Sequence, residues 1–262
     1  MSERSALEKA LIRDRWVIGA ALIVAVGLSW TWIVPMARDM YGEMRGSAVW
    51  MMPPAWDAWH NLLLFAMWLV MMAGMMLPSA APTFLLYAQV LRRSPDAQPL
   101  MPRVYAFAAG YLAIWTAFSL LATVLQRLLA ELLLLSPMMD IRSPVLGGAL
   151  LITAGLYQLT PFKRSCLQSC RSPAAFIAGH WRRGRAGAFR MGLEHGLMCL
   201  GCCWLLMLLL FVGGVMNLVW IAAITVFVLL EKLLPAGQFT SRLSGVLLVA
   251  GGIWSAITPQ LH

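Results

Sequence analysis

Long apolar runs recur along the whole chain, and they constrain its fold more than any other feature. Of the 262 residues, 61% are hydrophobic and only 12% are charged, whereas soluble domains are about 45–50% apolar and about 25% charged. A helix that crosses the hydrocarbon core of a bilayer needs about 20 mostly apolar residues. The composition therefore predicts an all-α polytopic membrane protein and leaves no room for a sizeable soluble domain.

Seven segments are apolar enough to span the bilayer. They are residues 16–36, 60–90, 104–124, 144–159, 186–212, 215–230 and 243–257. The second segment contains Pro78 and Pro82, which remove helical hydrogen bonds and predict a kink. Residues 125–135 either continue the third segment or lie in the membrane interface. We therefore expect a cytoplasmic N-terminal segment, residues 1–15, followed by one transmembrane helical domain, residues 16–262.

Basic residues are distributed unequally between the two sides of these segments. Sixteen of the 20 Lys and Arg residues fall on the side of the N-terminus, and the other four are Arg38, Arg45, Arg127 and Arg142. Because cytoplasmic loops are enriched in Lys and Arg, we expect an N-in/C-out orientation in a bacterial inner (cell) membrane. The net charge of +9 then reflects orientation and contact with anionic headgroups of the lipid bilayer, and no nucleic acid partner is expected.

Polar and sulfur-containing side chains interrupt the fifth apolar segment, between residues 194 and 204. Asp, Lys or Arg at the centre of a spanning helix costs about 2.5–3.5 kcal/mol, and ionisable residues there usually pair or bind something. One helical face carries three potential ligands and two more at its margins: His195, Cys199 and Cys202, then Met198 and Cys203. Soft and borderline metal ions prefer such ligands, so the pattern predicts a metal site. Packing of small buried cysteines is the alternative.

Two further groups of residues bear on this prediction. Glu194 lies about 100° from His195 on the helix, which favours a supporting or ion-pairing role for this carboxylate. Methionines recur along the second apolar segment, at Met67, Met71, Met72, Met75 and Met76. Thioethers favour Cu(I), although methionine stripes are also common in simple packing. The two segments could meet near the middle of the membrane, where Gly74 would permit close helix approach.

The remaining two cysteines, Cys166 and Cys170, fall in a basic stretch, residues 160–185, that we expect to form a cytoplasmic loop. Neighbouring cations favour the thiolate form of cysteine, which suits metal acquisition or thiol exchange; incidental thiols in a topogenic loop are the alternative. Two thiolates alone do not complete a structural zinc site. Because all five cysteines lie between residues 166 and 203, free thiols or metal ligands fit better than a disulfide framework.

Few other residues suggest chemistry. Glu231 and Lys232 end the sixth apolar segment, where a local ion pair is the expected arrangement. The sequence contains no glycine-rich phosphate loop, nucleophile elbow or zinc-protease HExxH motif. The sequence therefore favours a protein that is not an enzyme.

These motifs together resemble the family called domain of unknown function 2182, described as predicted metal-binding integral membrane proteins. The resemblance covers most of the chain from about residue 60 onward. It is carried by Met71–Ser79 with Pro82, Gly155–Lys163, Cys166, Cys170, Arg171, Pro173, Gly192, His195, Gly196, Cys199, Gly201–Trp204, Met207, Glu231 and Lys232. The resemblance implies a metal site built from these residues in a membrane protein.

The expected function is metal handling, transport or delivery, with Cu(I) as the first-choice ion and zinc as the second. The expected intramembrane site contains His195, Cys199, Cys202 and Cys203, faced by Met71, Met75 or Met76, while Cys166 and Cys170 exchange metal with the cytoplasmic side. A metallochaperone or a membrane metalloenzyme complex would be the partner. A structural or assembly subunit of a larger membrane complex is the main alternative. A thiol-redox enzyme ranks last, because a disulfide between adjacent cysteines is strained.

Overall fold

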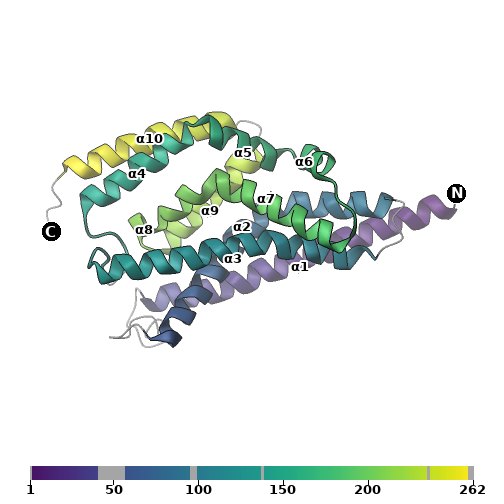
Figure 1. Ribbon diagram of the computed structural model, residues 1–262, viewed down its shortest axis with the longest axis horizontal. Helices are drawn as coiled ribbons and strands as arrows, with labels where there is room; N and C mark the ends of the chain where they lie inside the picture. Colours follow the sequence, from purple (N-terminus) through teal and green to yellow (C-terminus); the bar gives the residue numbers. More distant parts are fainter. Residues whose placement is uncertain (1, 41–56, 95–98, 137–138, 235–236, 259–262) are drawn as a thin grey trace.

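The computed structural model describes residues 2–40, 57–94, 99–136, 139–234 and 237–258, and within these ranges the chain forms ten helices and no β-strand (Figure 1). The helices are α1 (Ser2–Met40), α2 (Ala58–Arg93), α3 (Leu100–Glu131), α4 (Pro144–Gln158), α5 (Pro161–Arg171), α6 (Pro173–His180), α7 (Gly184–Leu208), α8 (Leu210–Gly213), α9 (Leu218–Leu233) and α10 (Gly237–Ile257). The all-α fold predicted from the sequence is confirmed.

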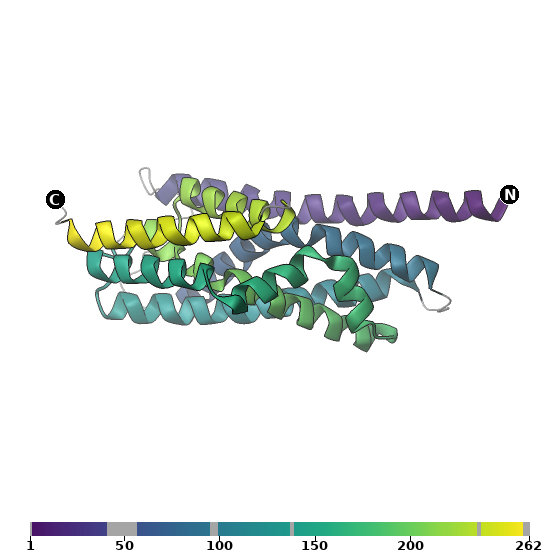
Figure 2. The same cartoon turned by 90° about the horizontal axis from the view of Figure 1, so that it is seen from above.

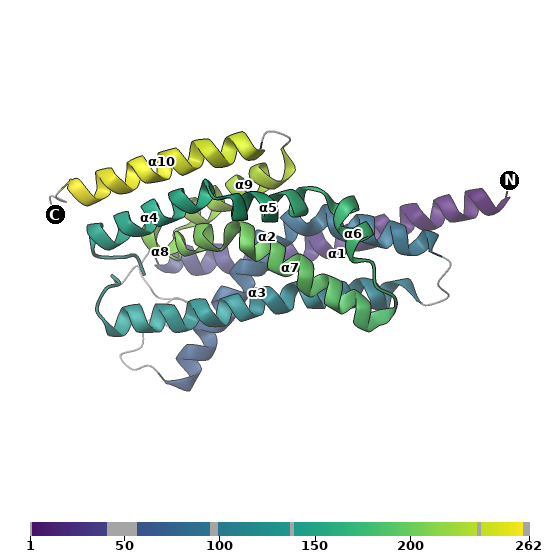
Figure 3. The ribbon, with the colours of Figure 1, turned by 45° about the horizontal axis from the view of Figure 1, so that its top comes forward.

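The long helices lie roughly along one direction and form an elongated bundle. In Figure 2 the N-terminal part of α1 extends beyond the other helices, and α4 and α10 lie together at the opposite end. Figure 3 shows α5 and α6 as short helices that cross over between α4 and α7. Helix α2 contains Pro78 and Pro82 and changes direction midway along its length, as the sequence predicted (Figure 1).

Five helical stretches are long and apolar enough to cross a membrane, so the described chain has the character of a multi-pass membrane protein. They are Arg13–Met40, Ala58–Arg93, Leu100–Glu131, Gly184–Gly213 and Phe239–Ile257. Helices α4 and α5 form a sixth candidate only if they are taken as one span bent by 65°. The structure thus supports five to six spans rather than the predicted seven, because α4 and α9 have only 15 and 16 residues. Helix α3 continues to Glu131, so most of the undecided stretch after residue 124 is helical.

The basic stretch 160–185, predicted to be a loop, instead contains the two helices α5 and α6. Helix α5 begins at Pro161, and the Thr160 side chain accepts a hydrogen bond from the Lys163 backbone N–H. A threonine cap followed by proline at the first helical position is a strong start for a helix. Helix α5 packs against α7, which brings its two half-buried cysteines beside α7.

Glycines allow the two most closely packed helix pairs to touch through their backbones. A Cβ atom on Gly192 of α7 would lie only 2.1 Å from the Phe107 carbonyl oxygen of α3. Helices α4 and α10 approach in the same way where Gly148 faces Gly252. Gly74 also permits a close approach, but to α1 rather than to α7, since its Cβ would lie 2.9 Å from Ser29 Cβ. Small residues at such crossings are typical of membrane helix packing.

Two adjacent glycines of α10 test this packing. Gly252→Ala places a methyl group 2.6 Å from the Gly148 carbonyl oxygen, whereas a Cβ on Gly251 meets no atom within 4 Å. We expect Gly252→Ala to lower the free energy of unfolding by about 1–3 kcal/mol, and Gly251→Ala to leave it unchanged or slightly raise it. Thermal unfolding of the two variants in the same detergent is the measurement. Equal unfolding midpoints for both variants would contradict the packing described here.

Candidate functional site

Three buried thiols gather on α7 around one backbone carbonyl. Cys202 and Cys203 follow Cys199 by three and four residues, so they lie on the neighbouring turn of the helix. Their thiols donate to the Cys199 carbonyl oxygen at 3.1 Å and 3.0 Å. All three side chains are at most 1% exposed. The structure therefore places these cysteines in the protein interior rather than against lipid.

Helix α5 contributes a fourth thiol to this group. Cys170 lies close enough to Cys199 and Cys202 for its side chain to interact with theirs, as Cys203 does from α7 itself. The thiol cluster, defined here as Cys170, Cys199, Cys202 and Cys203, thus joins cysteines that the sequence assigned to separate sites. Cys166, one helical turn before Cys170, is half-buried, and its sulfur occupies the space beside Gly201.

One methionine of α2 reaches the thiol cluster. The Met76 sulfur lies 3.9 Å from the Cys203 sulfur. Met71 lies elsewhere, in a small gap lined by Met67 and Met216 and by residues of α1. Met75 is fully buried in the core, and Met198 is half-buried on α7. The methionines of α2 therefore do not all face the thiol cluster: Met76 contacts it, whereas Met71 packs near α1.

A lysine from α9 projects into the same region. The Lys232 ammonium donates to Cys199 Sγ at 2.9 Å and to the Ser79 hydroxyl at 3.1 Å. The Tyr111 hydroxyl lies 3.1 Å from Cys199 Sγ and 3.2 Å from the Met76 carbonyl oxygen. Cys199 consequently lies where α2, α3, α7 and α9 meet.

The local ion pair expected between Glu231 and Lys232 does not form. Adjacent helical residues point about 100° apart, and Glu231 instead pairs with Lys163 of α5 at 2.7 Å. Both side chains are almost fully buried, and Lys163 also donates to the Gln158 side chain. Sequence reasoning thus missed Lys163, Lys232, Ser79 and Tyr111 as partners. Two oppositely charged neighbours at the end of an apolar helix were the available clue, because they require two separate partners.

His195 lies in an aromatic cage one turn before Cys199. Its ring centroid is 5.0 Å from that of Phe176, 5.6 Å from that of Tyr111 and 6.0 Å from that of Phe107. The side chain is 2% exposed, and Nδ1 has no hydrogen-bond partner among the described residues. Tyr111 contacts both this ring and Cys199, which links His195 to the cluster.

Glu194 forms ion pairs with Arg182 at 2.9 Å and with Arg190 at 3.6 Å, which confirms the ion-pairing role predicted for it.

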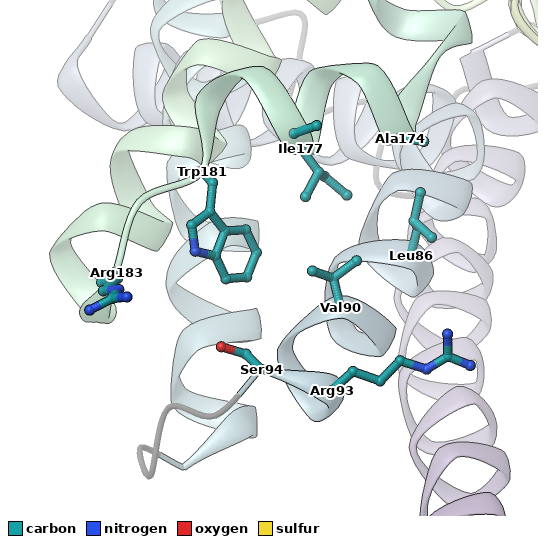
Figure 4. Close-up of a pocket in the computed structure, with 9 residues that line it drawn as sticks. Leu86, Val90, Arg93, Ser94, Ala174, Ile177, Trp181 and Arg183 are labelled. Carbon is teal, nitrogen blue, oxygen red and sulfur yellow. The ribbon is translucent and has the colours of Figure 1, made fainter.

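A hollow of about 780 Å³ lies between α2 and α6. Figure 4 shows Ile177 of α6, Trp181 just after α6 and Val90 of α2 pointing into it. Its lining residues include no cysteine, histidine or methionine, so it is not a candidate metal centre.

The thiol cluster is held by hydrogen bonds rather than arranged around a single point. Across the ranges that the structure describes, no three His, Cys, Asp or Glu side chains have the spacing of a ready-made metal site. The cluster and the adjoining Met76 still combine sulfur donors from three helices with a cation and a phenol. Such sulfur donors match the ligand preference of soft metal ions, and the ligand roles of the individual residues remain predictions.

Comparison with known proteins identifies the family. The chain matches no curated protein and no protein of solved structure. One family model, described as PpoB2: Copper chaperone, matches residues 65–255 and so includes all five cysteines, Met71–Met76 and Lys232. The resemblance to domain of unknown function 2182 is not confirmed by name, although both descriptions concern metals. Since the match covers well over half of the sequence, the chain belongs to the PpoB2 copper chaperone family.

Proposed function

We propose that this protein binds Cu(I) at the thiol cluster inside a membrane and delivers it to a partner protein. The observation that carries the proposal is the meeting of three buried thiols of α7 with the half-buried Cys170 thiol of α5, beside the Met76 thioether. Membership of a copper chaperone family supports copper as the cargo. Soft sulfur ligands select Cu(I) over harder ions, which leaves zinc as the second choice.

Cys199 and Cys202 are the proposed primary ligands, because the side chain of each interacts with those of both Cys170 and Cys203. A cysteine binds a metal as the thiolate, so a ligand that still carries its proton releases it as copper arrives. Cys170 and Cys203 are then in reach to exchange with the first two sulfurs. His195, whose buried Nδ1 lacks a partner among the described residues, is a candidate additional ligand. Met75, Met71 and Met198 are assigned supporting roles at most.

Copper exchange is proposed to take place through α5. With the predicted N-in/C-out orientation in a bacterial inner membrane, α5 belongs to the cytoplasmic half of the protein. Cys166 is half-buried and lies one turn from Cys170, which suits a first or last contact for copper. A metallochaperone or a membrane metalloenzyme complex is the proposed partner.

The most direct prediction concerns copper affinity. We expect the purified protein to bind Cu(I) under reducing, oxygen-free conditions in competition with a chromophoric chelator. The triple variant Cys199→Ser/Cys202→Ser/Cys203→Ser should bind Cu(I) more than about 100-fold more weakly. Loss of a residue that only supports a metal ligand typically weakens binding by about 10–100-fold.

Two controls accompany this measurement. Gly251→Ala, which touches nothing within 4 Å, should bind Cu(I) like the wild type, and unfolding curves should show that the triple variant is folded. Equal and substoichiometric copper in the wild type and in the triple variant would contradict the proposal. If the wild-type protein bound no copper and copurified with other membrane subunits, that result would favour the structural or assembly role.

A pair of methionine substitutions separates ligand from packing roles on α2. Met76→Leu removes the thioether 3.9 Å from Cys203 Sγ, whereas Met71→Leu alters a gap lined by other methionines. Such volume-conserving changes usually cost less than about 1.5 kcal/mol of stability. We expect Met76→Leu to weaken Cu(I) binding and Met71→Leu to leave it unchanged, as measured by the same competition. The reverse order of effects would rule out Met76 as the methionine ligand.

A further inference from the structure

The buried charges around the thiol cluster do not balance unless one of its sulfurs is anionic. Lys163 and Glu231 neutralise one another at 2.7 Å, with 0% and 1% of their side chains exposed. Lys232, the next residue along α9, is 6% exposed and has no carboxylate in hydrogen-bonding reach among the described residues. An unpaired buried ammonium is costly, and of the two described side chains that Lys232 contacts, Ser79 and Cys199, the Cys199 sulfur is the one that can compensate this charge.

Two hydrogen bonds hold the Lys232 ammonium between α2 and α7. The Ser79 hydroxyl accepts from Nζ at 3.1 Å while Nζ donates to Cys199 Sγ at 2.9 Å. Ser79 lies on α2 and Cys199 on α7, so the ammonium bridges two helices. The Tyr111 hydroxyl lies 3.1 Å from the same sulfur. Lys232 can therefore remain hydrogen-bonded to Cys199 after that sulfur has also bound a metal ion.

We propose that Lys232 is the specificity-determining residue of this site and that it selects monovalent over divalent metal ions by charge. This inference rests on the proposed function. When Cu(I) binds two thiolates, the resulting complex has one negative charge, which the Lys232 ammonium cancels. A divalent ion bound to the same two thiolates forms a neutral complex, and the lysine charge is then left uncompensated in a buried site.

The binding step balances without any redox change. The Cys199 thiolate and the Cys202 thiol form bonds to Cu(I), the one proton of Cys202 passes to the solvent or to the ligands of the copper donor, and copper stays in the +1 state. Lys232 keeps its protons throughout. The lysine acts through the charge of the whole complex, so it is a positioning and selectivity residue rather than a metal ligand.

The test compares two soft ions that bind two thiolates in the same way but differ in charge. Full-length protein in detergent is titrated with Ag(I), the oxygen-stable counterpart of Cu(I), and separately with Hg(II). We expect Lys232→Met to weaken Ag(I) and Cu(I) binding by roughly 100-fold, as a single charge a few ångströms away implies, and to leave Hg(II) affinity unchanged or higher. Lys232→Arg keeps the charge and should restore most of the selectivity.

A second pair of variants leaves Lys232 in place. Ser79→Asp introduces a carboxylate beside the ammonium and should lower the preference for Ag(I) over Hg(II), whereas Ser79→Asn, of the same shape without the charge, should not. Similar losses for Ag(I) and Hg(II) in Lys232→Met, or equal effects of Ser79→Asp and Ser79→Asn, would overturn the inference and assign Lys232 a packing role. A wild-type protein that binds Hg(II) but neither Ag(I) nor Cu(I) would overturn the proposed function as well, so the two failures are distinguishable.

Discussion

Every charged group buried in this bundle has to find its partner inside the protein, and this constraint organises the region around α9. Within an apolar bundle water is not available to solvate a lone ammonium or carboxylate. Glu231 and Lys232 are neighbours in sequence, but their side chains diverge and reach Lys163 on α5 and Cys199 on α7. The end of α9 therefore links the helix that supplies Cys170 to the helix that carries the other three thiols of the cluster.

The thiol cluster depends on how closely the helices approach. Gly110 and Gly192 bring the backbones of α3 and α7 into contact, which holds Tyr111 against Cys199. Gly201 leaves space on α7 for the Cys166 sulfur, so α5 can lie against the helix that it serves. A side chain at any of these glycines would push the sulfur donors apart. The same few glycines thus allow the helices to pack closely and bring the sulfur donors of the thiol cluster together.

The sequence predicted the long apolar helices and the cysteine face of α7, because both follow from short-range periodicity, but it missed α5 and α6. The helical repeat brings Cys199, Cys202 and Cys203 together on one side regardless of the tertiary structure. The position of Cys170 depends on the packing of α5 against α7, which no local pattern reveals. The partners of Lys232 are separated from it by 33 and 153 residues along the chain, so only the folded structure could identify them. The span count was too high because apolarity alone does not measure helix length.

The central claim is that the sulfurs of the thiol cluster, on α5 and α7, hold the copper. X-ray absorption spectroscopy at the copper edge, on purified protein loaded with Cu(I), tests it most directly because the spectrum identifies the atoms bound to the metal. The account predicts a low-coordinate shell made of sulfur, which is lost in the Cys199→Ser/Cys202→Ser/Cys203→Ser variant. A shell of oxygen and nitrogen atoms, unchanged by those substitutions, would contradict it.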